Sequence, residues 1–377
     1  MLIPFVLAAV VAQPITAPLR QVELPSGVVI IAENQPEAEA FSLTLTASSR
    51  GAEDTEATYG YRHLLEQLVA RGVDGEVDRR LESVGAYLTA QTTREALIFE
   101  INGPPEYVAL AADVMVGLVG EFEPTAEDIE REAELIEEEI GLLPPALHVV
   151  KRAWSEAYGE TALDTHGDAD VIALATPEEM TALHREHFRA PGIALALVGP
   201  FETEVSLSRL TELAESIRPG SVRSQRAWIA ERSEVTVGFG QFMGRAVVVA
   251  GLQDGPSVHA LAAALALGQA VPGLTPIYNP SSEAGLITLS APRPDAVEEL
   301  DALSVSELRS LYPIGRSLLR KWLENELSDP TSASRLRSQL VVAKPDMRPD
   351  WLLDSLEQMT EADFVRAAER FQTGGEN

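Results

Sequence analysis

Residues 60–72 read GYRHLLEQLVARG, and this stretch decides which fold we expect. Apolar residues recur in it at helical spacing, at Leu64, Leu65, Leu68 and Val69. The period predicts a helix from Tyr59 to Arg71 with one apolar face that packs on a core.

The same helix carries three polar residues, His63, Glu66 and Gln67. Residues three and four apart project from one face of a helix, so His63 and Gln67 can hold one ion with Glu66 beside it. The inverted zinc motif His-x-x-Glu-His has two histidine ligands and a glutamate base, and Gln67 stands at its second histidine. Without further context, ordinary side chains on the wet side of an amphipathic helix are the more economical interpretation.

Segments on either side of this helix predict an α+β lobe. Strands in runs, interrupted by helices and joined by hairpins, favour this class over a doubly wound parallel sheet. Turn formers, β-branched runs and the helix start Thr125 with Asp128 locate the elements. We expect strands within 21–34 and at 41–49, a helix near 77–84, strands within 86–102, helices over 105–121 and 127–142, a helix from Thr176-Pro177, and the buried strand IALALVG.

The second half repeats this order loosely. It offers a strand at 246–253, the Ala/Leu-rich helix VHALAAALALGQ, the strand GLITLSAP and a helix from Val305 to Glu326. Strand, acidic turn and helix in both halves predict two related lobes, each a mostly antiparallel sheet packed with helices. We place the first lobe at 20–202 and a shortened second lobe at 203–377.

Composition narrows the classes of function. The 377 residues suffice for about two domains, and 45% apolar residues allow them real cores. A formal charge of −29 repels a phosphate backbone, so nucleic acid is not an expected partner. The chain has no cysteine, so a metal must be held by His, Asp or Glu.

The first twelve residues, MLIPFVLAAVVA, form an apolar run that is too short for a stable membrane span. The run ends in small residues suited to cleavage, so we predict a signal peptide and leader over 1–19 and export to the periplasm or the exterior. No Lys or Arg precedes the run. A buried N-terminal strand or a misplaced start site is therefore the alternative.

Beyond single motifs, segments spread over residues 20–202 agree in order and spacing with one family. The chain resembles the insulinase/pitrilysin family of inverted-motif zinc metallopeptidases, of the mitochondrial processing peptidase type, with a degenerate metal motif. The segments that carry the resemblance are LPSGVVIIAENQP, FSLTLTASSRGAED, GYRHLLEQLVARG, LESVGAYLTAQTTRE, EREAELIEEEI and TPEEMTALHREHFRAPGIALALVGPF.

The resemblance assigns a role to each of five residues. It implies His63 as the first zinc ligand, Gln67 at the second, Glu139 as the third, Glu66 as the general base, and Glu132 as a supporting glutamate behind the ligands. The activity it implies is zinc-assisted peptide hydrolysis. Glu137 or Glu138 replaces Glu139 if the register slips within the run of glutamates.

Two departures from the family pattern weaken the expected activity. Gln67 offers a neutral carbonyl oxygen, a poor zinc donor beside an imidazole nitrogen, so zinc binding is expected to be weak or absent. Active members or their partner subunits also carry an Arg and a Tyr in the other lobe. The segment 268–286 has no arginine, and Tyr278 does not align clearly. His259 has no carboxylate at the offset needed to rebuild a site.

Other histidines carry less weight. His184 and His187 can bracket a metal at helical spacing, but surface positions on the closing helix are the simpler interpretation. His166 lies among three aspartates in DTHGDAD, and a solvated loop is favoured there over a cation site.

Three functions follow as hypotheses. We favour a catalytically impaired or inactive homologue that pairs with a second family subunit, or with its own copy, in a peptidase-like clamshell. The second is an active zinc endopeptidase on extended peptides that uses His63, Glu66 and Glu139. The third is an exported binding protein for basic peptides, drawn by the acidic charge.

Overall fold

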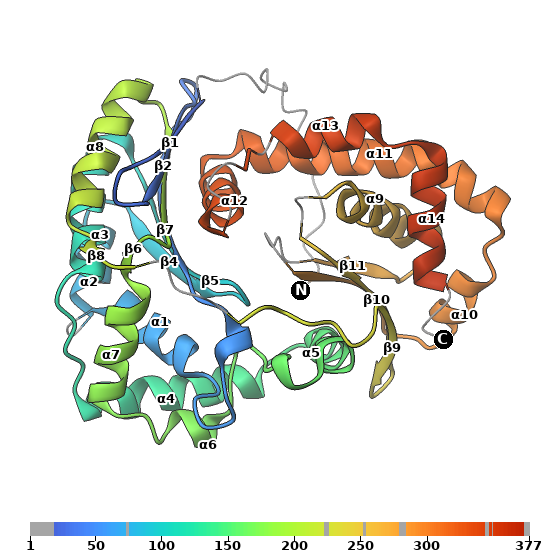
Figure 1. Cartoon of the computed structure of the whole chain (residues 1–377), viewed down its shortest axis with the longest axis horizontal. Helices are drawn as coiled ribbons and strands as arrows, with labels where there is room; N and C mark the ends of the chain where they lie inside the picture. Colours follow the sequence, from blue (N-terminus) through green and yellow to red (C-terminus); the bar gives the residue numbers. More distant parts are fainter. Residues whose placement is uncertain are drawn as a thin grey trace.

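A computed structural model describes residues 19–72, 75–221, 226–251, 254–278, 284–343, 347–348 and 350–372. Figure 1 shows two sheets side by side, with helices on the outer side of each. The predicted signal peptide lies outside the described residues. No helix in the described part of the chain is long and apolar enough to cross a membrane.

The first sheet has six strands and comes from the N-terminal half. β2 pairs parallel with β7, and every other pair is antiparallel. In spatial order the strands are β1 (Leu19–Glu23), β2 (Val29–Asn34), β7 (Ile193–Gly199), β3 (Phe41–Ser48), β5 (Ala96–Gly103) and β4 (Tyr87–Thr92). The hairpin turn at Pro25-Ser26-Gly27 separates β1 from β2, as predicted.

Helices cover the outer face of this sheet. Their apolar stripes meet β3 and β5 in one core that includes Leu64, Leu65 and Phe99, all fully buried. Burying such side chains supplies the main stabilisation of the lobe. The helices are α1 (Tyr61–Arg71), α2 (Glu76–Glu82), α3 (Val108–Val119), α4 (Ala126–Gly141), α6 (Ala169–Ile172), α7 (Pro177–His187) and α8 (Thr203–Glu215), with the short turns η1 (Gly51–Glu53), η3 (Pro105–Tyr107) and η4 (Gly159–Thr161).

Local signals set several helix starts. Thr125 and Asp128 form a capping box at the start of α4, and Thr176 and Glu179 form another at α7. The expected helix over 105–121 divides into η3 and α3, and Pro105 stands at the first position of η3, where a helix does not use the missing N–H. Two-residue strands, β6 (Arg189–Ala190) and β8 (Arg218–Pro219), pair beside α8.

The second sheet has four antiparallel strands. In order they are β11 (Thr275–Ile277), β12 (Gly285–Ala291), β10 (Phe242–Val249) and β9 (Glu234–Phe239). It packs with α9 (Gly255–Ala270), α10 (Asp295–Asp301), α11 (Val305–Ser328), α13 (Asp350–Gln358) and α14 (Glu361–Gln372). The expected strand at 246–253 begins earlier, at Phe242, and the described part of it ends at Val249.

Two further helices cross between the halves. α5 (Pro145–Tyr158) follows the first-sheet helices in sequence but packs on β9, β10 and β12, while α12 (Pro330–Ala343) packs on β3 and β7. Figure 1 shows α5 under the second sheet and α12 against the first. Each sheet is thus covered by a helix from the other half, and our sequence prediction assigned neither. The lobe boundary at residue 202 stays a prediction.

These layers confirm the predicted α+β class with mostly antiparallel sheets packed with helices. They also position α1. It lies over the outer face of the first sheet with its polar side toward β4 and α4, so residues of three elements meet around His63 and Glu66.

Candidate functional site

His63 is held in one orientation by a backbone group. Its Nδ1 lies 3.1 Å from the carbonyl oxygen of His166. A carbonyl only accepts, so Nδ1 carries the proton and Nε2 keeps its lone pair. Nε2 in turn lies 3.5 Å from Oε2 of Glu139. Burial lowers the pKa of His63, although the His166 carbonyl and the charge of Glu139 act in the opposite direction.

His63 and Glu139 therefore turn lone pairs toward one space. A neutral imidazole nitrogen beside a carboxylate oxygen is an arrangement that attracts a cation. Among the three neighbouring glutamates, Glu137 and Glu138 are exposed and have no ion pair with a described residue. Glu139 is thus the one that faces His63.

Glu66 is a buried acid next to this space. Its side chain is 5% exposed, and its Oε2 accepts a hydrogen bond of 3.3 Å from Thr92 Oγ1. Burial raises the pKa of Glu66 to about 7, against the lowering effect of Thr92 and with a further increase from Glu139. A carboxyl group that titrates near neutral pH is suited to proton transfer.

Gln67 and Glu132 take no visible part in this group. Gln67 is partly buried, and its amide makes no hydrogen bond to a described residue. Glu132 is 2% exposed, and its Oε1 pairs with Arg71 at 3.1 Å and with Arg131 at 3.2 Å. Its charge is balanced by arginines within the described chain. The supporting role assigned to it stays a prediction.

The donors present do not fit a firmly held zinc ion. Within the described ranges, no group of three or more His, Cys, Asp or Glu side chains is placed to hold a metal. A catalytic zinc site uses three protein ligands of the imidazole, thiolate or carboxylate kind, and here only His63 and Glu139 converge. The ligand roles of His63, Gln67 and Glu139 stay predictions.

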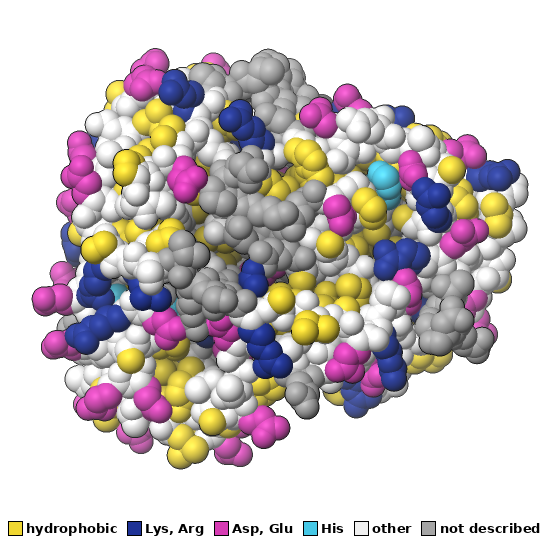
Figure 2. Space-filling model, in the orientation of Figure 1, with side chains coloured by type: hydrophobic (Ala, Val, Ile, Leu, Met, Phe, Trp, Pro, Cys, Tyr) yellow, Lys and Arg dark blue, Asp and Glu magenta, His cyan; other side chains and the backbone are white. Residues whose placement is uncertain are grey.

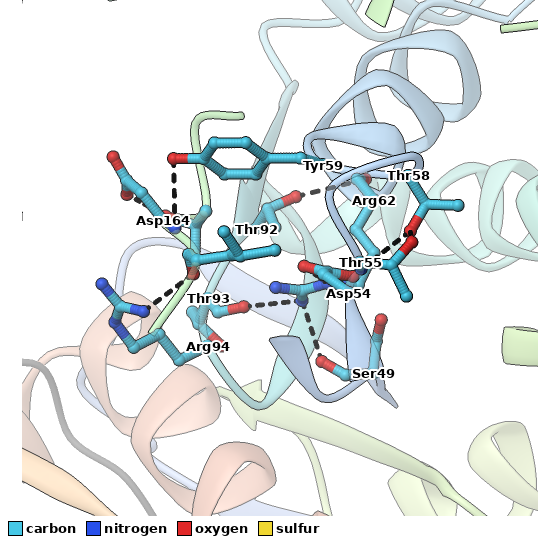
Figure 3. Close-up of polar contacts among 12 residues, drawn as sticks. Ser49, Asp54, Thr55, Thr58, Tyr59, Arg62, Thr92, Thr93, Arg94 and Asp164 are labelled. Atoms are coloured by element: carbon cyan, nitrogen blue, oxygen red, sulfur yellow. Dashed lines mark hydrogen bonds and ion pairs between the residues drawn. The ribbon is translucent and has the colours of Figure 1, made fainter. Parts of the chain in front are cut away.

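The start of α1 is fixed by a polar network around Arg62, which is 3% exposed (Figure 3). Its Nε donates to both carboxylate oxygens of Asp54, at 3.0 and 3.2 Å. Its Nη1 donates to the backbone carbonyls of Ser49 and Thr93, each at 2.9 Å. Burial raises the pKa of Asp54 even though Arg62 lowers it. Arg62 thus joins the loop after β3, helix α1 and the β4–β5 turn.

A second network involves the loop of His166, and here the prediction of a solvated loop is wrong. Asp164 is 6% exposed, and its Oδ1 lies 3.1 Å from Nδ1 of His166. Its Oδ2 lies 2.5 Å from Nζ of Lys151 on α5. The loop is docked against α1, which places His166 beside His63 with their ring centroids 6.1 Å apart.

The prediction that His184 and His187 are surface positions is also wrong, because both are buried. His184 stacks between Phe122 and Phe188, and its Nε2 lies 2.8 Å from the carbonyl oxygen of Leu118. Burial lowers its pKa to about 4, so it stays neutral in the core. The helical spacing was read correctly, but α7 turns this face inward.

Among the described residues of the second lobe, none forms a hydrogen bond or ion pair with His63, Glu66 or Glu139. His259 is on α9, away from α1, and near Asp254 and Asp363. Tyr278 follows β11, and the next five residues of the segment 268–286 lie outside the described chain.

Thr92, Asp164 and Lys151 belong to the surroundings of the site but were not singled out from the sequence. Thr92 contacts Glu66, 26 positions away, and Asp164 contacts Tyr59, 105 positions away. Lys151 lies on a helix that we did not predict. One signal was present. Gly60 and Gly167 both have positive φ, of 100° and 87°, and flank the two segments that meet. Glycine in two loops indicates close backbone approach.

Comparisons with known proteins agree with this geometry. Residues 29–166 match the model of the insulinase family, peptidase family M16. Mitochondrial-processing peptidase subunit beta of Lentinula edodes is 25% identical over 117 residues, which cover 30% of this chain and 25% of that protein. Subunit alpha of Solanum tuberosum is 24% identical over 172 residues, 42% of this chain and 33% of that protein. The chain spans less than half the length of the curated relatives that it matches.

A solved structure extends the likeness of fold to almost the whole chain. A protease from Helicobacter pylori superposes with a TM-score of 0.78, over 95% of this chain and 97% of that one, at 11% identity. The family match runs from β2 through His166 and contains every candidate site residue. With the His-x-x-Glu-Gln variant of the motif on α1, residues 29–166 of the chain form a domain of the insulinase/pitrilysin family of peptidases.

Proposed function

We propose that this chain is a catalytically impaired member of its family that works as one subunit of a peptidase-like clamshell. In this proposal the face of α1 forms part of the wall of a peptide chamber, and a second family subunit, or a second copy of this chain, closes the chamber. The peptide it faces is extended, because an exposed sheet edge such as β4 accepts an added strand.

The observation that carries the proposal is residue 67. His63, Glu66 and Glu139 are gathered around one space, yet the last residue of the motif, Gln67, is an amide that bonds to no described residue. Loss of one strong donor weakens a metal site sharply, since the remaining ligands must do without its share of the binding energy. In this proposal the arrangement of His63, Glu66 and Glu139 is kept, while zinc binding and peptide hydrolysis are reduced.

A partner is supported by the names of the relatives. They describe an alpha and a beta subunit of a processing peptidase. Because the matches cover less than half the length of those relatives, their assembly is carried over here only as a proposal. Export of the chain is likewise part of the proposal, and it rests on the apolar N-terminal run.

Residual peptidase activity is the second candidate, and one observation favours it. Glu66 has a pKa of about 7 and lies beside the lone pairs of His63 and Glu139, so a competent base is in place. Binding of basic peptides has less support. Figure 2 shows acidic side chains dispersed over the visible face, with basic side chains among them, and no single acidic basin stands out there.

The test is a pairing experiment. The full-length chain is purified alone and together with a family member that keeps His-x-x-Glu-His, preferably one from a neighbouring reading frame. Light scattering gives the mass, and cleavage of a quenched fluorescent peptide gives the activity. We expect a complex in which the partner's activity rises, and no change when Glu66→Gln is introduced here. A chain that is monomeric at every concentration and leaves the partner unchanged contradicts the proposal. Cleavage by this chain alone that disappears with Glu66→Gln establishes the peptidase instead.

A further inference from the structure

We propose that Asp164 is a positioning residue for His63, and that Lys151 makes this positioning respond to the second sheet. The inference concerns the orientation of one side chain. It rests on the proposed function only in so far as His63 belongs to the peptide-facing site.

The first step is the dependence of His63 on the loop. The hydrogen bond from Nδ1 to the His166 carbonyl is what selects the tautomer with a free Nε2. The two imidazole rings also meet edge to face, with centroids 6.1 Å apart. A shift of the His166 backbone therefore changes both the rotation of the His63 ring and the nitrogen that carries its proton.

Asp164 fixes that backbone. Its Oδ1 lies 3.1 Å from the ring Nδ1 of His166 and 3.4 Å from the backbone nitrogen of the same residue. The backbone N–H of Asp164 donates to the Tyr59 hydroxyl at 3.3 Å, just before α1 (Figure 3). Asp164 thus bonds to both sides of the junction between the loop and the helix.

The loop and the start of α1 are in direct backbone contact at Gly60 and Gly167. A Cβ placed on Gly167 would lie 2.3 Å from the Cα of Gly60, and one placed on Gly60 would lie 2.8 Å from the Cα of Gly167. No side chain separates the loop from the start of α1. Movement of the loop is therefore passed directly to the helix that carries His63.

Lys151 connects this junction to the other sheet. Its Nζ lies 2.5 Å from Asp164 Oδ2, with the Lys151 side chain 25% exposed and that of Asp164 8% exposed. Burial alone raises the pKa of Asp164, but His166 and Lys151 together hold it well below its usual range, so the carboxylate stays charged. α5, which carries Lys151, is packed on the second sheet through Val149 and Ala153.

The contacts therefore form one path from the second sheet through Lys151 and Asp164 to His63. If a partner or peptide moves the second sheet and α5, the ion pair lengthens and the carbonyl that orients His63 is released. A purely structural ion pair would hold the loop without affecting the imidazole, and this difference can be measured.

The measurement is the tautomer ratio of His63, read from ¹⁵N signals of the imidazoles at one fixed pH in the whole chain. The chain has 6 histidines, and the signal of His63 is the one lost in His63→Asn. We expect Asp164→Ala to change the ratio about fivefold, the equivalent of one hydrogen bond of ordinary net strength. Asp164→Glu should restore part of the change, and Lys151→Met should produce a smaller change in the same direction.

The matched control is Asp168→Ala in the same loop. Asp168 caps α6 by accepting from the backbone nitrogens of Asp170 and Val171, so its loss disturbs the loop without removing the contact to His166. An unchanged His63 ratio in folded Asp164→Ala overturns the positioning role. An equal change in Asp168→Ala overturns it too, and an unchanged ratio in Lys151→Met overturns the link to the second sheet.

Two precautions keep the test decisive. If Asp164→Ala does not fold, Asp164→Asn and Lys151→Met supply the same comparison with smaller disturbance. The result is also separable from the proposed function. A change in the His63 ratio without any partner binding supports the positioning role and contradicts the paired subunit, while partner binding with an unchanged ratio does the reverse.

Discussion

Arg62 and Gln67 stand five residues apart on α1 and differ in how many hydrogen bonds their side chains make. Arg62 is buried and donates to a carboxylate and a backbone carbonyl in the loop after β3 and to a backbone carbonyl in the β4–β5 turn. Gln67 is partly buried and bonds to no described residue. Arg62 thus ties the start of α1 to two neighbouring segments, while Gln67, at the predicted second ligand position, forms no such link.

The difference indicates which part of the site the fold depends on. A buried arginine must be paired, because an isolated charge in a core is strongly unfavourable. Nothing comparable holds Gln67, so its identity is open to change at little cost in stability. The position of α1, and of Glu66 on it, therefore does not depend on a metal ligand at residue 67.

The largest expected effect is on the connected side. Arg62→Met removes the cation that balances Asp54 and leaves a buried carboxylate, so we expect a loss of about 3–5 kcal/mol in the free energy of unfolding. Denaturant unfolding measures it. The matched control is Arg20→Met, since the Arg20–Glu204 pair is exposed and should cost less than about 1 kcal/mol. Similar losses in both variants would show that burial does not set the strength of the Arg62 network.

The second effect concerns the pH dependence of stability through Glu66. Its folded pKa of about 7 lies above the ordinary value of 4.5, so between these values the folded state keeps a proton that the unfolded state has released. Stability from this proton is complete below about pH 4.5 and is lost as the pH rises through 7. In acid, Glu66→Gln should therefore have about the same free energy of unfolding as the wild type. In mild alkali it should be more stable than the wild type by on the order of 3 kcal/mol.

Unfolding curves of wild type and Glu66→Gln across this range provide the measurement. Glu178→Gln, at an exposed position in the first turn of α7, serves as the control and should follow the wild type. A constant difference between Glu66→Gln and wild type at all pH values would mean that Glu66 does not titrate near neutrality.

The third effect concerns zinc affinity and residue 67, which makes no hydrogen bond to a described residue. Gln67→His adds an imidazole next to His63 and Glu139 on a helix that is already formed, so we expect zinc affinity to rise by about an order of magnitude or more. Peptidase activity need not return, since the arginine expected in the second lobe is absent from the sequence of 268–286. Calorimetric titration of both proteins measures the gain.

Glu139→Gln in the Gln67→His background should remove that gain, whereas Glu137→Gln and Glu138→Gln should not. This set tests the register of the three glutamates independently. Equal, weak zinc binding by wild type and Gln67→His would mean that the donors do not converge around a metal, and the metal part of the proposal would then be abandoned.

The contrast between the two sides of α1 also explains what the sequence could predict. Periodicity and capping reveal the hairpin before β2, helix α1 and the start of α4, because those signals are local. The spacing of His63, Glu66 and Gln67 on one helix is local too. Family resemblance then singled out Glu139, whose Oε2 lies 3.5 Å from Nε2 of His63, and its role as a metal ligand stays a prediction.

Contacts between distant segments could not be predicted in this way. The burial of His184 depends on Phe122 and Phe188 closing over it, and the role of Asp164 depends on α5 packing on the other sheet. α5 itself has apolar residues at helical spacing, at Val149, Ala153, Trp154 and Ala157, and could have been found. The sheet on which α5 packs could not have been identified. Helical periodicity shows that one face of a helix is buried, but it does not show which element covers that face.

The smallest effect we predict concerns Thr92, which contacts both Glu66 and Arg62. Its hydroxyl is 3.3 Å from Glu66 Oε2 and 3.4 Å from the carbonyl oxygen of Arg62, so it touches both the acid and the scaffold. Thr92→Val removes a donor that favours the charged form of Glu66, and the pKa of that carboxyl should rise further. We expect the pH midpoint of the Glu66-dependent stability to move upward by roughly 0.5–1 unit, or about 1 kcal/mol, within the range of a hydrogen bond to a charged group.

The midpoint is obtained by comparing Thr92→Val with the double variant Thr92→Val, Glu66→Gln across the pH range. Thr89→Val is the matched control, because Thr89 lies on the same strand but reaches Glu100, at 3.5 Å. If Thr92→Val leaves the midpoint unchanged while lowering stability equally at all pH values, its hydroxyl serves the Arg62 side alone. Glu66 would then owe its pKa to burial and to Glu139, and the scaffold would not tune the acid.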